Sequence, residues 1–313
     1  MKGLDKKILV FTHGIDIDGY GCAILAKLAW GERADIVYAD TLEIDDKFLK
    51  IWNENGFEDY SQIFVTDHCP SLELCEVIDQ IPDLKNKICV LDHHFSRIGQ
   101  QDKFDWVSII SEKNGVKESG TSLFYKYLIN RLLLSPTLNL DEMVNLTRLY
   151  DTWEWTKINE VKADRLNNYA LAVGREEYVN NLLSSFKNNK QVWFGEEENK
   201  IVDDYLIAFN KKVAEYVEKI KVIDFADAKA GYVNILDIYK NDIATAVRNS
   251  ELKDKIDFML MPVDDRDTVS LRSIRPDFDV SAVAAQFGGG GHKGASSFPK
   301  INLPKIHFNK IEF

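Results

Sequence analysis

The stretch Lys87-Ile88-Cys89-Val90-Leu91-Asp92-His93-His94 joins a short apolar run to an acid and two adjacent histidines. Residues 87–91 have the composition of a buried strand, which places Asp92, His93 and His94 at its carboxyl end. Ligands bind at that edge of a parallel α/β sheet, and a carboxylate beside neutral imidazoles suits a divalent transition metal. Two histidines after a strand are more often plain turn residues, so this stretch alone leaves both interpretations open.

The residues before this stretch repeat a pattern of strand, loop and helix. We expect strands at 7–12, 35–39 and 62–66, and helices at about 20–30, 44–54 and 71–80. Gly31 ends the first of these helices and Ser71 is the N-cap of the third. Strands that alternate with such helices indicate a parallel sheet with helices on its faces. Right-handed crossovers then bring the loops after the strands to one edge.

Acidic residues and histidines occupy these loops. The first strand is followed by His13, Asp16 and Asp18, and the third by Asp67. Two aspartates at this spacing can give one carboxylate to each of two metal ions. N-capping of the helix by Asp18 is the structural alternative, which leaves Asp16 and His13 without a role. An EF-hand is excluded, because the third acidic position and the closing glutamate are absent.

Helices follow an irregular region at residues 102–118. We expect one helix from Ser119 to about 134 and another over 140–150, which delivers Asp151 at its end. Three aromatic residues lie beside that aspartate: Tyr150, Trp153 and Trp155. Aromatic rings can stack on bases, although large aromatic residues more often pack in a core. The sequence leaves both possibilities open.

The second half of the chain is organised differently. Residues 176–222 form a helical pattern rich in Lys, Glu and Asn, which is typical of a connector with solvated charged faces. A smaller α/β unit follows, with expected strands at 232–238, 256–262 and 268–274 and helices at about 242–250 and 279–287. It ends in Gly288-Gly289-Gly290-Gly291-His292. Such a run is unfavourable in a folded domain unless backbone N–H groups must approach an anion; a flexible linker fits poorly inside the unit.

Composition bounds the class of protein. The 313 residues suffice for about two domains, and 45% hydrophobic with 28% charged residues is typical of a soluble globular protein. We expect no membrane span and no signal sequence, because no apolar run approaches ~20 residues. The four cysteines have no Cys-x-x-Cys spacing, which favours reduced thiols in a cytoplasmic protein. A net charge of −11 argues against a protein that coats long nucleic acid, but not against a short phosphate-bearing substrate.

Taken in order, these motifs resemble the DHH family of phosphoesterases with a C-terminal DHHA1 domain. They are His13…Asp16-x-Asp18, then Asp67, Asp92-His93-His94, Asp151 and Gly288–His292. One such motif is weak evidence, whereas five in this order across about the whole chain are specific. The compact two-domain oligoribonucleases (nanoRNases) are most similar in size and layout. The longer RecJ-like exonucleases carry extra domains, and the family's inorganic pyrophosphatases have a different C-terminal domain.

The resemblance implies a layout and a set of site residues. It implies a DHH metal-binding catalytic domain at 1–175, a helical connector at 176–222 and a DHHA1 substrate-binding domain at 223–313. It also implies two Mn²⁺ ions per chain, which could clamp a phosphodiester for in-line attack. The ligands would be His13 and Asp16 for one ion, Asp18, His93 and Asp151 for the other, and Asp67 as a bridge.

Two further residues and the second domain complete the implied site. Asp92 would orient His93 through its second ring nitrogen, and His94 would contact the scissile phosphate or protonate the leaving oxygen. The implied substrate-binding residues are Arg272, Ser273, Gly289, Gly290, Gly291 and His292. Arg272 lies in Ser270-Leu271-Arg272-Ser273, which is similar to the family's substrate strand.

We therefore expect a cytoplasmic, Mn²⁺-dependent phosphodiesterase that trims very short RNA to mononucleotides. The alternatives are a linear or cyclic dinucleotide phosphodiesterase, a 3′,5′-bisphosphate nucleotide phosphatase and a RecJ-like single-strand exonuclease. A nucleotide-binding sensor with an idle metal site is a rival of another class, and the complete set of expected ligands argues against it. The sequence leaves open the direction of attack, RNA versus DNA, and whether the chain forms a homodimer.

Overall fold

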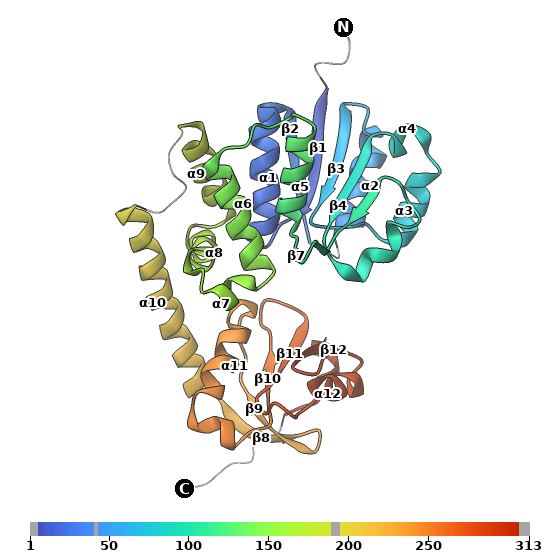
Figure 1. Ribbon diagram of the computed structural model, residues 1–313. Helices are drawn as coiled ribbons and strands as arrows, with labels where there is room; N and C mark the ends of the chain where they lie inside the picture. Colours follow the sequence, from blue (N-terminus) through green and yellow to red (C-terminus); the bar gives the residue numbers. More distant parts are fainter. Residues whose placement is uncertain (1–5, 41–42, 189–194, 307–313) are drawn as a thin grey trace. The chain divides into compact units, whose positions relative to one another are not determined.

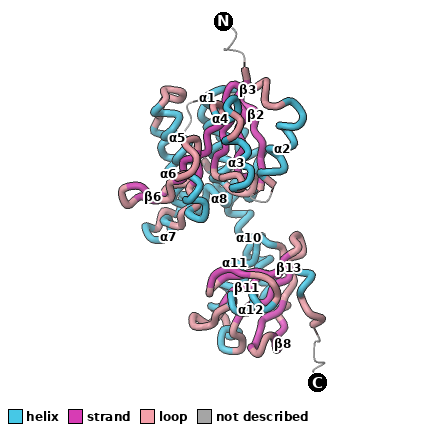
Figure 2. Tube along the Cα trace, turned by 90° about the vertical axis from the view of Figure 1, so that its right-hand side faces the viewer, coloured by secondary structure: helices cyan, strands magenta, loops and turns pink. Residues whose placement is uncertain are grey.

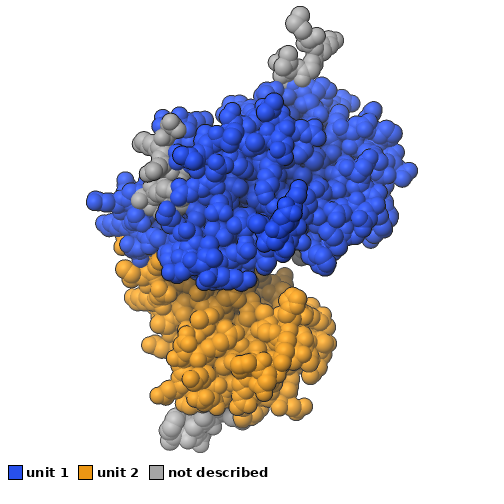
Figure 3. Space-filling view, in the orientation of Figure 1, with its two compact units in different colours: residues 1–203 blue, residues 204–313 orange. Residues whose placement is uncertain are grey.

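The computed structural model in Figure 1 describes residues 6–40, 43–188 and 195–306. The chain divides into two compact units, residues 1–203 and 204–313, which are coloured separately in Figure 3. The division falls inside helix α10 (Glu196–Glu218) and therefore within the expected connector. The three-part division into 1–175, 176–222 and 223–313 stays a prediction.

Unit 1 is built on a parallel sheet of five strands in the order β2-β1-β3-β4-β5. The strands are β1 (Lys7–His13), β2 (Ala34–Ala39), β3 (Tyr60–Thr66), β4 (Ile88–Asp92) and β5 (Val107–Ile109). The first four lie where the sequence predicts strands. The short strand β5, together with β6 (Glu112–Lys113) and β7 (Val116–Lys117), falls in the region expected to be irregular. Strands of two or three residues are too short to give a periodic pattern.

Helices cover both faces of this sheet (Figure 1). The helices are α1 (Ile17–Trp30), α2 (Ile44–Asn55), α3 (Leu72–Asp79), α4 (Pro82–Lys85) and α5 (Gly120–Asn130). Leu9 and Phe11 of β1 share a buried cluster with Phe48 of α2 and Cys75 of α3. On the opposite face, Phe64 of β3 packs against aromatic rings of α1 and α5. Figure 2 shows the strands between α2 on one side and α5 on the other, which confirms the expected α/β class.

The remaining helices of unit 1 pack on the side of α1 and α5. They are α6 (Leu138–Asp151), α7 (Glu154–Ile158), α8 (Val161–Val173) and α9 (Arg175–Lys187), followed by the first part of α10. The sequence predicts α6 correctly, and its last residue is Asp151. None of the helices within the described residues combines the length and the apolar character needed to cross a bilayer. All four cysteines are free thiols, as expected.

Unit 2 contains a mixed six-stranded sheet in the order β12-β13-β11-β10-β9-β8. Its elements are β8 (Lys221–Phe225), β9 (Ala228–Tyr232), α11 (Lys240–Arg248), β10 (Phe258–Pro262), β11 (Thr268–Ser273), α12 (Val280–Gln286), β12 (Gly290–His292) and β13 (Ala295–Pro299). The alternating residues of β10 divide between two cores. Met259 and Met261 pack with α11, while Phe258 and Leu260 pack with α12.

One strand expected in unit 2 is misplaced. Strand β9 ends at Tyr232, and residues 237–239 form a 3₁₀ turn, so the expected strand at 232–238 is wrong. The apolar side chains of Val233 and Ile235 are buried in the core although their backbone lies outside the strands. Burial of a connecting segment therefore produced a strand-like pattern.

Candidate active site

The expected metal ligands of unit 1 gather at the carboxyl edge of its sheet. His13 ends β1, Asp67 follows β3, and Asp92 ends β4. The ligand atoms form two triads and a group of four (Asp67, Asp92, His93 and His94), each with its atoms within 4.8 Å of one another. The triads are His13, Asp16 and Asp67, and Asp18, His93 and Asp151. This grouping agrees with the division between two ions that the family resemblance implies, although ligation itself stays a prediction.

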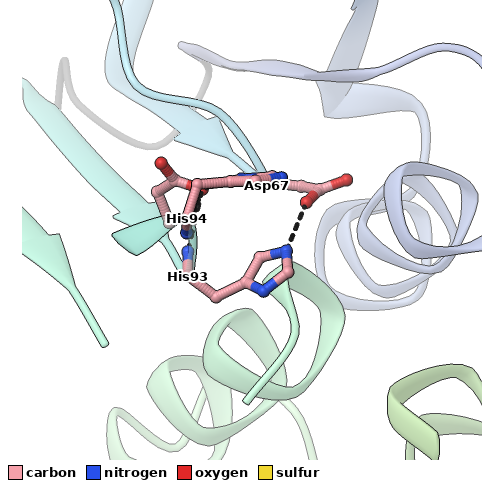
Figure 4. A group of neighbouring side chains, drawn as sticks. Asp67, His93 and His94 are labelled. Atoms are coloured by element: carbon pink, nitrogen blue, oxygen red, sulfur yellow. Dashed lines mark hydrogen bonds and ion pairs between the residues drawn. The ribbon is translucent and has the colours of Figure 1, made fainter. Parts of the chain in front are cut away.

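Asp67 belongs to the first triad and also lies close to His93 of the second. One of its carboxylate oxygens is 3.2 Å from Nε2 of His93 (dashed line in Figure 4), and the other is 3.9 Å from Nδ1 of His13. The backbone of Asp67 has a φ of 58°, in the left-handed region, where aspartate and asparagine are better tolerated than most residues. A Cβ at Gly120 would lie 2.4 Å from the Cβ of Asp67, so only glycine lets α5 begin this close.

Like charges crowd this site. Burial, followed by the charges of Asp18 and Asp16, raises the pKa of Asp67 well above its usual range. The same causes raise the pKa of Asp151 to about 9. Among the described residues, the buried Oδ2 atoms of Asp92 and Asp151 have no hydrogen-bond partner. A divalent cation would relieve the repulsion, and the mixed carboxylate and imidazole donors suit Mn²⁺. The residues therefore fit the implied metal.

The N-cap of the first helix is a different aspartate from the one that the structural alternative in the sequence analysis named. The N-cap of α1 is Asp16, whose side chain accepts a hydrogen bond from the backbone N–H of Gly19 at 3.2 Å. The carboxylate of Asp18 instead accepts from the backbone N–H groups of Gly120, at 2.6 Å, and Thr121, at 2.9 Å. Asp18 is thus an anion at the positive end of α5. N-capping of the first helix by Asp18 is wrong.

The side chain of Asp92 is hydrogen-bonded to the ring of His94, whereas the sequence analysis expects it to orient His93. Its Oδ1 accepts from the backbone N–H of His93 at 2.8 Å and lies 2.7 Å from Nδ1 of His94. The proposal that Asp92 orients the His93 ring is therefore wrong, because side chains two residues apart in extended backbone point the same way. The His94 side chain is 51% exposed, and its hydrogen bond to Asp92 raises its pKa.

Two further residues near His13 were not predicted. The ring of His68 meets the His13 ring edge-on with 4.7 Å between centroids, and its Nε2 is 3.0 Å from the carbonyl oxygen of Ala39. Oδ1 of Asp40 is 3.8 Å from Nε2 of His13. Asp40 directly follows strand β2, so the rule that ligands gather at strand ends could have identified it.

Comparisons with known proteins agree with this geometry. No protein-family model matches the sequence. Oligoribonuclease NrnB of Bacillus subtilis is 28% identical over 294 residues, which cover 92% of this chain and 71% of that protein. The solved structure of exonuclease RecJ bound to manganese has a TM-score of 0.57 and 17% identity, with 94% of this chain and 86% of that chain covered.

A second solved structure carries the name of the family. It is the DHH domain of a protein described as a member of the s1p family of ribosomal proteins. Its TM-score is 0.53 at 15% identity, with 94% of this chain and 83% of that chain covered. These two structures show the fold, and the 28% identity to NrnB extends the likeness to the sequence. The chain has the fold of these DHH-type proteins and is similar in sequence to NrnB.

Unit 2 contains a cleft of about 360 Å³ that is lined mainly by polar residues. Its lining includes Arg272, Gly290 and Gly291, together with Asp237, whose carboxylate pairs with Lys240 at 2.7 Å and with Arg266 at 3.2 Å. The guanidinium group of Arg272 donates hydrogen bonds to Oδ1 of Asn241 and to Oγ of Ser270, each at 2.9 Å. Because neutral acceptors hold the guanidinium group of Arg272, this side chain is suited to bind an anion.

The other expected substrate-binding residues lie outside the lining of this cleft. The Ser273 hydroxyl is buried and donates to the carbonyl oxygen of Arg275, and His292 is exposed at the end of β12. A Cβ at Gly289 would lie 2.1 Å from the carbonyl oxygen of Ser297, so close packing explains this glycine. Gly290 has open space around it. Part of the glycine run thus serves packing, and substrate binding by these residues stays a prediction.

Proposed function

We propose that this chain is a Mn²⁺-dependent phosphodiesterase that degrades short oligoribonucleotides to mononucleotides. The observation that carries the proposal is the pair of ligand triads joined by Asp67. The sequence likeness to an oligoribonuclease supports the substrate class, and the fold shared with manganese-bound RecJ supports the metal. Hydrolysis of a phosphoester is the reaction common to these relatives.

Different residues of the chain would bind the metal ions and contact the substrate. His13 and Asp16 would hold one ion, Asp18, His93 and Asp151 the other, and Asp67 both. When bound, the two ions would stabilise negative charge on the phosphate and activate a water nucleophile. Asp92 fixes the ring of His94 through Nδ1, which leaves Nε2 facing away from that carboxylate. From there His94 would contact the scissile phosphate or protonate the leaving oxygen.

The test of this function is hydrolysis of a defined set of substrates by the purified chain with Mn²⁺. The set contains 5′-labelled RNA and DNA oligonucleotides, cyclic dinucleotides and 3′,5′-bisphosphate nucleotides. We expect short RNA to be converted to mononucleotides, and chelation of the metal to stop the reaction. Hydrolysis confined to cyclic dinucleotides or to bisphosphates would assign one of those functions instead. No hydrolysis of any substrate, with metal bound, would favour a sensor.

Substrate length gives a second prediction. Two doubly charged ions would change the net charge from −11 to about −7, so the site attracts phosphate while the remaining surface repels a long polyanion. We expect kcat/KM to be highest for the shortest RNAs and to depend weakly on salt. The measurement is kcat/KM for RNAs of increasing length at two salt concentrations. A steady rise with length and a steep salt dependence would indicate a RecJ-like exonuclease.

The cleft of unit 2 gives a third prediction, in which Arg272 binds a substrate phosphate. A hydrogen bond to a charged group contributes about 1.5–3 kcal/mol, so Arg272→Gln should lower kcat/KM by roughly 10–100-fold. Metal binding should not change. Arg275→Gln is the matched control, because Arg275 pairs with Asp257 at 2.9 Å and lies outside the cleft lining. Equal effects of both substitutions would remove the cleft from the proposed site.

A further inference from the structure

The indole ring of Trp153 is unusually exposed for so large an apolar group. Its exposed fraction is 60%, whereas large aromatic side chains are mostly buried. It follows Asp151 by two positions, and consecutive Cα atoms are about 3.8 Å apart, so the two Cα atoms lie at most about 7.6 Å apart. The backbone of Trp153 is therefore close to that of Asp151, an expected ligand of the candidate metal centre.

The backbone of Trp153 is strained. Its φ is 59°, in the left-handed region, which is rare for a bulky residue. The surrounding turn imposes this conformation. The N–H of Trp153 donates to the carbonyl oxygen of Tyr150 at 3.1 Å, and the hydroxyl of Thr156 donates to the carbonyl oxygen of Trp153 at 2.9 Å. An ion pair between Arg148 and Glu154 closes the turn. Strain that is held in this way is concentrated at ligand sites.

A neighbouring ring fixes the plane of the indole. Tyr150 stacks beside Trp153 with 6.3 Å between ring centroids and 26° between planes, and Trp155 continues the stack on Tyr150 at 13°. Phe95 is also exposed, at 71%. Among the described residues near the site, however, Trp153 alone combines exposure with a left-handed backbone and a stacked ring. The indole ring of Trp153 is therefore the exposed end of a stack of three aromatic rings.

We propose that Trp153 is the platform on which a nucleobase of the substrate stacks. The inference rests on the proposed function, because it takes the ligand to be a nucleotide whose phosphate lies at the metal centre. A nucleotide carries its base one sugar away from its phosphate, which brings the base to the indole. Stacking accepts any base, so Trp153 adds affinity for nucleotides without selecting a sequence.

The experiment compares a ligand with a base and one without. Binding of adenosine 5′-monophosphate and of ribose 5-phosphate is measured by calorimetry on the full chain with Mn²⁺. Stacking contributes about 1–3 kcal/mol per base, so Trp153→Gly should weaken adenosine 5′-monophosphate binding by about 5- to 150-fold. Ribose 5-phosphate should bind unchanged, which also demonstrates that the site is folded. Trp153→Phe should retain most of the base-dependent affinity.

Leu132→Gly is the matched control. Leu132 is 92% exposed at a φ of 57° just beyond α5, so the substitution also places glycine at an exposed left-handed position. We expect it to change the binding of neither ligand. Loss of both ligands in Trp153→Gly, or loss of neither, would overturn the proposal. Base-dependent binding in a chain that hydrolyses no oligonucleotide would overturn the proposed function and leave the platform standing.

Discussion

Asp67→Asn should abolish both the Mn²⁺-dependent rise in Tm and the hydrolysis of oligonucleotides, while the metal-free protein stays folded. Asparagine keeps the shape of the side chain and tolerates the left-handed backbone at this position, where φ is 58°. It loses the negative charge that lies close to His13 of its own triad and to His93 of the other. Saturation at a hundred times Kd stabilises a protein by about 2.7 kcal/mol, so the lost shift is measurable. Metal ions supply several kcal/mol to catalysis, and turnover should fall at least about a thousandfold.

The metal-free stability of this variant provides an independent test. Burial and the charges of Asp18 and Asp16 oppose ionisation of Asp67, as its raised pKa indicates. Without metal, the Asp67→Asn protein should therefore unfold at the same temperature as the parent or higher. Calorimetry with chelator and with Mn²⁺, together with metal analysis, makes both measurements. Two Mn²⁺ ions still bound per chain would contradict the assignment of Asp67.

Asp35→Asn is the matched control for this substitution. Asp35 lies near the start of β2, away from the carboxyl edge, and pairs with Lys7 at 2.9 Å. Because the Lys7 side chain is 51% exposed, loss of this ion pair should change stability by no more than about 1 kcal/mol. The Mn²⁺-dependent rise in Tm and the hydrolysis should both remain. A lost rise here would mean that removal of any carboxylate, rather than of Asp67, is responsible.

The first four strands of unit 1 were predictable because each is a short apolar run that ends at a polar loop. In a parallel sheet, that pattern is enough to bring His13, Asp67 and Asp92 to one edge, although they are far apart in the chain. Asp151 was predictable as the last residue of an apolar-faced helix. Periodicity therefore located the site through the elements that carry it.

Contacts between elements were not predictable in this way. Asp18 binds the start of α5, 102 positions away from Gly120, and nothing in either local sequence indicates the partnership. The side chain of Asp92 contacts the ring of His94 rather than that of His93, which depends on the direction of the side chains beyond the end of the strand. In unit 2, the glycine run suggested an anion site, whereas close packing against Ser297 explains Gly289. These features depend on tertiary geometry rather than on pattern.

His94→Ala should leave the Mn²⁺-dependent rise in Tm intact and reduce kcat by about 10²–10⁴-fold, the usual contribution of a general acid. The imidazole is half exposed and belongs to neither of the two triads. Asp92→Asn should produce a smaller loss, because it removes the charge that positions the His94 ring. In the His94→Ala background the same substitution should add little, since both act through one side chain. Additive losses would mean that Asp92 has a separate role.

The choice of substrate separates the two roles proposed for His94. A p-nitrophenyl phosphodiester has a leaving oxygen that departs without a proton, whereas the oxygen of a nucleotide needs one. If His94 is the proton donor, His94→Ala should lose far more activity on a dinucleotide than on the p-nitrophenyl ester. Equal losses would assign His94 to the phosphate itself. Loss of the Mn²⁺-dependent rise in Tm would contradict both roles. It would instead make His94 a metal ligand together with Asp67, Asp92 and His93, whose ligand atoms lie close enough for such a site.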